Sequence, residues 1–221
     1  MKWIANAGIK FLVGALMIGA LLFLPARTLV CPGAWLFMGL LFVPMFILGI
    51  VLCVKNPDLL KKRLNHKEKE KAQKGVLAFS GLIFIAGFVL SALDFRFGWS
   101  IVPTWLVIVS SVLFLLGYTM YAEVMRENAY LSRTIEVQEH QTVVSTGLYG
   151  VVRHPMYLAT LFMFLPIPLI LGSFWGLIPF ALYPVLIVVR IINEEKVLTE
   201  GLMGYKEYKT KVKSRLIPFI W

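Results

Sequence analysis

The chain has 221 residues, of which 59% are hydrophobic, and its mean hydropathy is +0.79. This apolar content exceeds what the core of a soluble domain of this length requires, so the composition excludes an ordinary soluble fold and indicates an integral membrane protein. The formal net charge of +10 fits basic loops lying against anionic lipid headgroups. It does not indicate nucleic acid binding, because no aromatic residues interleave the basic run from Lys61 to Lys74.

Apolar stretches follow one another along the chain. A membrane crossing needs about 20 mostly apolar residues, and we predict four such helices at Trp3–Leu24, Trp35–Val54, Val76–Leu93 and Thr104–Tyr121. A longer apolar region between Tyr157 and Ile192 is broken by Pro166, Pro168 and the turn 171–173. Because Gly and Pro punctuate a run too long for one crossing, this region is predicted to be a helical hairpin. The expected fold is therefore an all-α integral membrane protein with about six transmembrane helices.

The Lys and Arg residues of the predicted loops are unevenly distributed. The loop 55–74 holds eight and the tail 205–215 holds five, whereas the loops after the first and third spans offer only Arg27 and Arg96. Cytoplasmic loops retain cations, so this bias predicts that both termini are cytoplasmic. We divide the chain into two accessory N-terminal helices (1–54), a basic cytoplasmic loop (55–75), and a membrane core with a cytoplasmic C-terminal tail (76–221).

A segment without helical periodicity follows the fourth span. Thr142, Val143 and Val144 favour extended structure over 135–152, and Ser145-Thr146-Gly147 is a turn signal. We expect this segment to fold back on the membrane surface.

A polar island, Arg153-His154-Pro155-Met156-Tyr157, stands directly before the hairpin. Pro155 suits the first turn of a helix and keeps His154 out of helical geometry. Arg153 and His154 are thus predicted just outside a helix N-terminus, where free N–H groups suit a carboxylate or phosphate. Taken alone, an Arg at the end of a span is more typical of a headgroup anchor.

Two adjacent glutamates, Glu194 and Glu195, lie at the far end of the hairpin. Acidic residues near a helix C-terminus oppose the macrodipole and cost stability unless they are paired. Because the two ends of a hairpin are neighbours, one glutamate is expected to approach Arg153 and His154. Adjacent helical residues point about 100° apart, so one should face a cavity and the other water. A plain ion pair with Arg153 or Arg190 is the alternative to a functional site.

The tail adds Tyr205 and Tyr208, which fall on one helical face, and then Arg215. The tyrosines suit either an interfacial anchor or a lid over a cofactor ring. Arg215 suits either a phospholipid or the acid group of a cofactor.

Three motifs now stand in a fixed order: GLYGVVRHPMYLA at 147–159, EEKVL at 194–198, and GYKEY at 204–208 with RLIP at 215–218. Together they resemble the isoprenylcysteine carboxyl methyltransferase family, and the related phospholipid N-methyltransferases and small-thiol S-methyltransferases share much of the pattern. The resemblance covers about 128–218. It implies methyl transfer from S-adenosylmethionine, held at the cytoplasmic side, to a lipid-like or small acceptor: an isoprenylcysteine carboxylate, a phospholipid amine or a thiol.

The resemblance also implies roles for individual residues. Arg153 and Glu195 are the implied catalytic residues, with Glu195 facing cofactor hydroxyls or Arg153. The implied cofactor contacts are Tyr149, His154, Pro155, Tyr157, Glu194, Glu195, Tyr205, Tyr208 and Arg215. An acceptor that must lose a proton, such as a thiol or an amine, needs a base, and Glu123, Glu127, Glu194 and water are all candidates. No metal is implied, because the scattered histidines lack ligand spacing.

Two other functions compete. Membrane sterol reductases that use NADPH have a similar Arg-His-Pro and tyrosine-rich pattern, but they are longer, and 221 residues leave little room for a sterol site. A non-catalytic lipid-binding protein is the other alternative, and it would leave the combination of Arg153 with Glu194 and Glu195 unexplained.

Overall fold

The computed structural model describes residues 2–64, 71–131 and 137–221, which form helices joined by turns and irregular segments, with no strand among them. Lys67 and Lys69 of the predicted basic loop and Ile135 of the predicted extended segment lie outside these residues. The elements are α1 (Lys2–Ala26), α2 (Pro32–Lys55), α3 (Pro57–Leu64), α4 (Lys71–Phe97), α5 (Thr104–Glu127), the 3₁₀ turn η1 (Gly147–Gly150), α6 (Pro155–Phe164), α7 (Ile167–Ile170), α8 (Leu177–Phe180), α9 (Tyr183–Gly201) and α10 (Tyr205–Lys211).

Five segments are long and apolar enough to cross a membrane: Ala5–Ala26, Pro32–Lys55, Gly75–Phe97, Thr104–Glu127 and Leu177–Gly201. They confirm an all-helical, multi-pass membrane protein. The first arm of the predicted hairpin is a shorter apolar segment, Pro155–Ile170, so a count of six crossings stays a prediction. The sequence 55–75, predicted as a loop, contains the short helix α3 and the start of α4.

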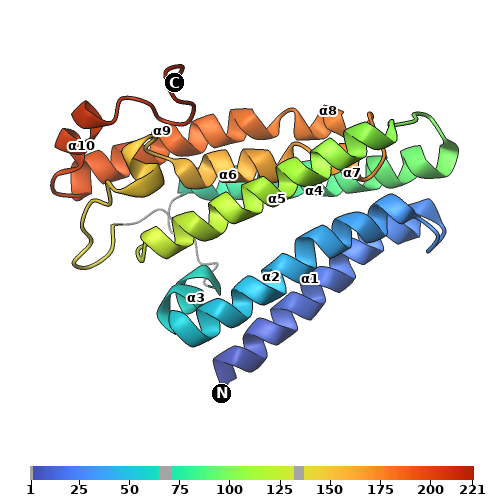
Figure 1. The fold of residues 1–221 in the computed structure, drawn as a ribbon, viewed down its shortest axis with the longest axis horizontal. Coiled ribbons are helices and arrows are strands. Elements are labelled where there is room, and N and C mark those ends of the chain that lie inside the picture. The colour runs from blue at the N-terminus through green and yellow to red at the C-terminus, as the bar shows by residue number, and fades with distance from the viewer. Residues whose placement is uncertain (1, 65–70, 132–136) are drawn as a thin grey trace.

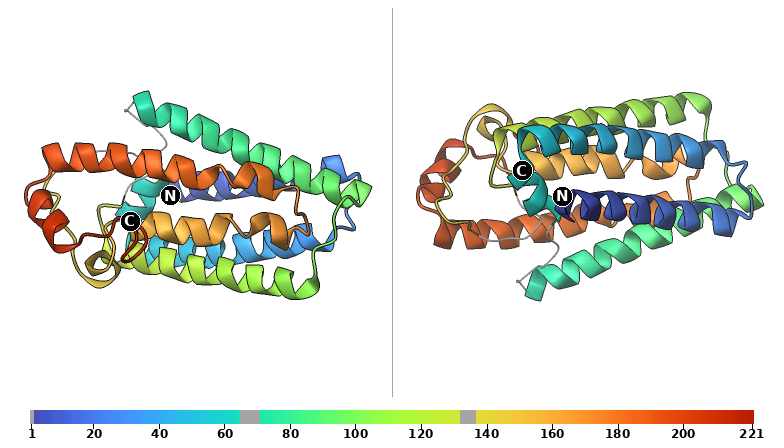
Figure 2. Two further views of the ribbon diagram at one scale, coloured as in Figure 1. Left: turned by 90° about the horizontal axis from the view of Figure 1, so that it is seen from above. Right: turned by 90° about the horizontal axis from the view of Figure 1, so that it is seen from below.

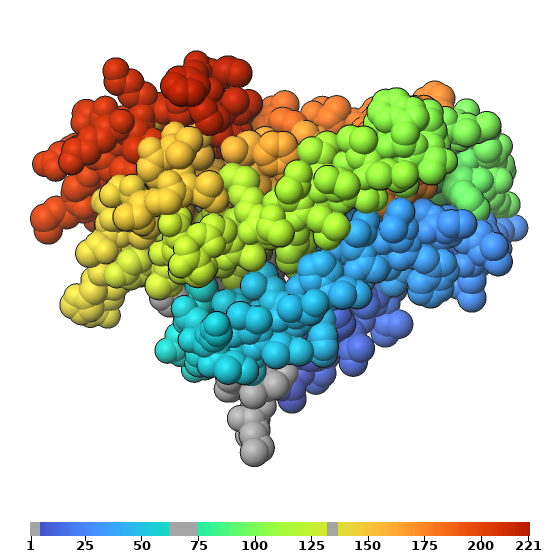
Figure 3. Space-filling model, viewed as in Figure 1, coloured from blue at the N-terminus to red at the C-terminus, as the bar shows by residue number. Residues whose placement is uncertain are grey.

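The helices run back and forth along one long axis (Figures 1 and 2). Helices α6 and α7 run one way and α8 and α9 return beside them, which is the hairpin arrangement expected from the sequence. The segment 137–150, α3 and α10 gather at one end of the bundle, and the short connections 98–103 and 171–176 lie at the other. In the space-filling view the C-terminal residues, in red, form the outer surface over the hairpin at the first of these ends (Figure 3).

Close packing of α5 against α6 fixes the position of the hairpin. A Cβ atom at Gly117 of α5 would lie 2.9 Å from the carbonyl oxygen of Ala159 in α6, and 2.9 Å from Met163. Small residues at such contacts let helix backbones approach in membranes. Aromatic side chains fill the interior beside this contact, with Phe37, Phe114 and Phe180 fully buried.

A buried carboxylate ties together the short connections at the far end. Asp94 is 0% exposed. Its Oδ1 accepts the Ser100 N–H at 2.8 Å, and its Oδ2 accepts the hydroxyls of Ser100 and Ser173, each at 2.5 Å. The Ser173 hydroxyl in turn accepts the Gly176 N–H at 3.0 Å. This network joins the α4–α5 connection to the turn of the hairpin.

The segment before α6 is less extended than its β-branched residues suggested. Within the part that the structure describes, 137–146 forms no strand and 147–150 forms the turn η1. Gly147 adopts φ +51°, and a Cβ atom there would fall 1.8 Å from Glu127 Oε1. Glycine at this position therefore allows the left-handed turn to close against the end of α5.

Candidate active site

The N-terminus of α6 is joined to the C-terminal tail through the backbone. His154, with φ −125° and ψ 58°, is the non-helical cap, and Pro155 opens the helix, as the sequence predicted. The Arg153 N–H donates to the Ser214 carbonyl at 3.0 Å and the His154 N–H donates to the Arg215 carbonyl at 2.9 Å. Tail carbonyls thus bind backbone N–H groups that sequence reasoning had left free for an anion.

Glu195 lies at the centre of an ionic cluster beneath this junction. Its side chain is 4% exposed, and Oε1 accepts Arg153 Nε at 2.6 Å and lies 3.3 Å from His154 Nε2. Its Oε2 lies 3.1 Å from Arg215 Nε and 3.7 Å from Lys209 Nζ. The Arg153 guanidinium also donates from one terminal nitrogen to the Val212 and Lys213 carbonyls, both at 2.7 Å. One carboxylate therefore holds together α6, α9 and the tail.

Glu194, the neighbouring residue, points the other way. It lines a cavity at this end of the bundle. The Tyr157 hydroxyl donates to its Oε2, and Arg190 Nε donates to the Tyr157 oxygen at 2.8 Å. The helical geometry of adjacent residues separates the two glutamates as expected, but Glu195 faces cations rather than open water.

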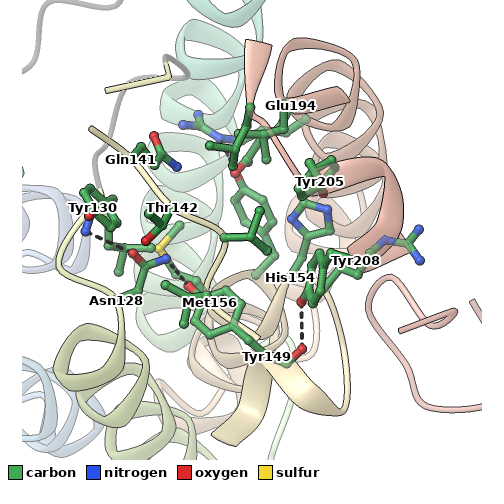
Figure 4. Close-up of a pocket in the computed structure, with 18 residues that line it drawn as sticks. Asn128, Tyr130, Gln141, Thr142, Tyr149, His154, Met156, Glu194, Tyr205 and Tyr208 are labelled. Atoms are coloured by element: carbon green, nitrogen blue, oxygen red, sulfur yellow. Dashed lines mark hydrogen bonds between the residues drawn. The ribbon is translucent and has the colours of Figure 1, made fainter. Parts of the chain in front are cut away.

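The cavity is open to solvent on one side, and its empty space, counted together with that opening, is about 850 Å³. Figure 4 shows His154, Tyr205 and Tyr208 on one side of it and Asn128 and Tyr130 on the other. Of the residues predicted to contact a cofactor, the structure brings these to its wall: Tyr149, His154, Tyr157, Glu194, Tyr205 and Tyr208, together with Arg153. Glu195, Pro155 and Arg215 do not line it.

The tail tyrosines differ in their hydrogen bonds. The Tyr208 hydroxyl donates to the Tyr149 carbonyl at 2.7 Å. The Tyr205 hydroxyl is buried and has no hydrogen-bond partner among the residues that the structure describes. Burial, followed by the negative charges of Glu195 and Glu194, raises the pKa of the Tyr205 hydroxyl above its ordinary value. Tyr205 therefore offers a neutral donor to the cavity, and an unsatisfied buried hydroxyl is costly without a ligand.

Several wall residues were not found by sequence reasoning. They come from the residues just after α5, the irregular segment, the first turn of α6 and the turn of α9 before the glutamates: Asn128, Tyr130, Gln141, Thr142, Met156 and Arg190. Asn128 Nδ2 donates to the Tyr149 hydroxyl at 2.9 Å and so orients it. The only available signal was a run of polar residues directly after an apolar span.

The three glutamates considered as candidate bases, Glu123, Glu127 and Glu194, lie in different surroundings. Arg126 donates to Glu123 at 2.5 and 2.8 Å, and Glu127 accepts the Leu148 N–H at 3.2 Å. Neither carboxylate lines the cavity, whereas Glu194 does.

Fold and site together define a class: a multi-pass helical membrane protein with an open cavity, lined by polar and aromatic side chains, at one end of the bundle. Residues 105–204, from α5 to just past the end of α9, match the model of the phospholipid methyltransferase family, which indicates a membrane methyltransferase that acts on lipid-like substrates. Isoprenylcysteine carboxyl methyltransferases belong to the same membrane methyltransferase family, and the resemblance found in the sequence is confirmed at that level. No curated protein matches the chain.

Proposed function

We propose that this protein is an S-adenosylmethionine-dependent methyltransferase whose active site is the cavity between α5, α6, α9 and the tail. The observation that carries the proposal is that residues of all three family-like motifs, Tyr157, Glu194 and Tyr205, line one cavity within or beside the matched domain. When bound, S-adenosylmethionine supplies an activated methyl group on a cationic sulfur.

The residues of the wall fit that group. The Tyr205 hydroxyl lacks a partner among the described residues and suits a hydroxyl or carboxylate of the cofactor. The Glu194 carboxylate provides negative charge for a cationic ligand, and the rings of Tyr149 and Tyr157 provide aromatic faces. A cation over such a face gains about 0.5–2 kcal/mol. Holding an acceptor in line with the methyl group can lower a barrier by roughly 7–11 kcal/mol.

Arg153 and Glu195 act in this proposal as positioning residues. The Arg153 guanidinium already binds Glu195 and two tail carbonyls, and Glu195 stands behind it, outside the cavity wall. Their shared role is to hold His154 and the tail against the cavity.

The acceptor that the cavity suits best is a phospholipid amine. An amine arrives at neutral pH as an ammonium, and it must release a proton before its nitrogen lone pair can react. Glu194 attracts the ammonium and is the one candidate carboxylate that reaches the cavity. Its Oε2 accepts the Tyr157 hydroxyl, so that hydrogen bond holds the carboxylate in place to take the proton. A carboxylate acceptor would meet repulsion from the same group.

Calorimetry with S-adenosylhomocysteine tests the cofactor. We expect binding to the purified protein, and Tyr205→Phe should weaken it roughly five- to tenfold by removing one hydrogen bond, with no loss of thermal stability. Tyr208→Phe is the matched comparison: it removes the bond to the Tyr149 carbonyl and should cost about 1 kcal/mol of stability. Tight NADPH binding without S-adenosylhomocysteine binding would contradict the proposal and favour a reductase.

Radiolabelled S-adenosylmethionine tests the acceptor. Label should enter phosphatidylethanolamine in vesicles rather than a prenylcysteine carboxylate or a small thiol, and Glu194→Gln should slow amine methylation roughly 100-fold. Glu123→Gln is the control, because Glu123 pairs with Arg126 away from the cavity. Unchanged amine methylation in Glu194→Gln would remove Glu194 as the base.

We also propose that the cavity faces the cytoplasm, because the basic segments gather at its end of the bundle. Single cysteines in a background where Cys31 and Cys53 are Ala test this orientation. An impermeant maleimide added to intact cells should label Ile101→Cys and should label Glu139→Cys only after permeabilisation. The reverse pattern would invert the topology.

A further inference from the structure

A second hollow lies on the other side of Glu195 from the cavity. It is an open groove on the outer surface of α9, closed along one side by α10 and the tail, and it is lined by Ile192, Glu195, Lys196, Thr199, Glu200, Lys209 and Arg215. It shares no lining residue with the cavity described above, and the Arg153–Glu195 ion pair stands between them.

The groove has a surplus of positive charge. Four cations, Arg153, Lys196, Lys209 and Arg215, lie in or directly behind it, against the two carboxylates Glu195 and Glu200, which leaves two positive charges. Glu195 is shared among three of these cations, and its shortest contact is to the buried Arg153. The side chains of Lys209 and Arg215 keep 32% and 36% exposure, so they remain accessible to an anion from outside.

The helix surface locates the groove at the membrane boundary. Val185, Val189 and Ile192 form an exposed apolar stripe along α9, and the next residue of that stripe, one turn on, is the exposed Lys196. The change from aliphatic to basic side chains within one turn is typical of the level at which acyl chains give way to headgroups. Beside the groove, the tail also exposes Ile217, Phe219 and Ile220.

We propose that this groove binds an anionic phospholipid, with the lipid phosphate against Lys196, Lys209 and Arg215 and an acyl chain along the apolar stripe of α9. The charge surplus and the apolar stripe that leads into the groove both favour this occupant. A free anion would use only the first of these features. The site does not depend on the proposed methyl transfer, since it lies outside the cavity.

The position of the groove gives the lipid a structural consequence. Arg215 binds Glu195 through its side chain, and its carbonyl accepts the His154 N–H. The Arg215 guanidinium also lies over the Trp221 ring at 5.2 Å. A phosphate held at Arg215 and Lys209 would neutralise the surplus charge and keep the tail against α9. Anionic lipid should therefore stabilise the folded protein.

The test is the thermal unfolding midpoint of the whole protein in neutral detergent, titrated with phosphatidylglycerol, phosphatidylcholine or inorganic phosphate. Phosphatidylglycerol should raise the midpoint most. The variant Lys196→Gln/Lys209→Gln should require roughly 25-fold more of it, because each of the two basic residues at an anionic surface contributes about fivefold in affinity. The charge-matched control is Lys206→Gln/Lys211→Gln, which removes two exposed lysines that do not line the groove.

Three results would overturn the proposal. An equal loss in the control variant would mean general surface attraction without a site. Equal effects of phosphatidylglycerol and phosphatidylcholine would mean that net lipid charge is not recognised, and a full effect of inorganic phosphate would mean that the groove takes a free anion. Binding of S-adenosylhomocysteine by the Lys196→Gln/Lys209→Gln variant, measured without lipid, reports separately on the cavity and on folding.

Discussion

The two ends of the bundle each contain a buried carboxylate, and the two are held in different ways. The donors to Asp94 in the structure are all neutral: one N–H and two serine hydroxyls. Glu195 instead lies within 4 Å of the side-chain nitrogens of two arginines, a lysine and a histidine. The first arrangement fixes a turn. The second joins segments whose other side chains form a cavity. The end of the bundle that contains the cavity therefore depends on charge, whereas the opposite end depends on hydrogen bonds between neutral donors and a carboxylate.

Removal of the charged centre should have the largest effect. Glu195→Ala leaves Arg153 buried without its carboxylate, and the loss of one partner of a buried pair costs about 3–5 kcal/mol. We expect a large drop in the thermal unfolding midpoint and loss of S-adenosylhomocysteine binding. Glu200→Ala, an exposed carboxylate five residues further along α9, should change neither. An unaltered ligand affinity in Glu195→Ala would show that the cavity is independent of the ionic cluster.

Removal of the Asp94 carboxylate, whose hydrogen-bond donors are all neutral, should have an intermediate effect on stability that is confined to its own end of the bundle. Asp94→Ala deprives the Ser100 N–H and two hydroxyls of their acceptor, which should cost about 2–3 kcal/mol. Asp94→Asn keeps an oxygen acceptor and should cost less. Both variants, once folded, should bind S-adenosylhomocysteine as the unmodified protein does, because Asp94 lies at the opposite end from the cavity. A lowered affinity would mean that the two ends are coupled through the hairpin.

A smaller effect on stability and ligand binding is expected at Gly147, which supports the site only through its backbone conformation. Gly147→Ala imposes a left-handed conformation on a residue with a side chain, at about 1–2 kcal/mol, and it displaces Glu127 from the Leu148 N–H. Melting and ligand titration should both shift modestly. Gly150→Ala is the control within the same turn, because its Cβ would lie 3.2 Å from the Ser145 carbonyl oxygen and its φ is ordinary. Equal behaviour of the two variants would argue against strain at Gly147.

The sequence predicted the site end better than the far end, for a physical reason. Arg153 and Glu195 stood out because charges beside apolar runs need partners, and hairpin geometry brings them together. Asp94 gave no such signal, since its partner Ser173 lies 79 residues away and serine is common in any turn. Asn128 and Gln141 of the cavity wall were missed because the sequence around them shows neither helical nor strand periodicity.

Local propensity also misled in one segment. Thr142, Val143 and Val144 favour strands, yet the described residues around them form no strand. Extended structure needs a partner to satisfy its backbone groups, and this bundle of helices provides none among the residues described. Here tertiary context overrides β-propensity.

The most direct test of the central claim is methyl transfer by the purified protein in vesicles that contain phosphatidylethanolamine, with radiolabelled S-adenosylmethionine in excess. We predict that label appears in the lipid fraction with the unmodified protein and with Asp94→Asn, and that it falls to background with Glu195→Ala. No label in lipid from a folded protein that binds S-adenosylhomocysteine would contradict the proposed acceptor. Full labelling by Glu195→Ala would contradict the claim that the ionic cluster holds the active site together.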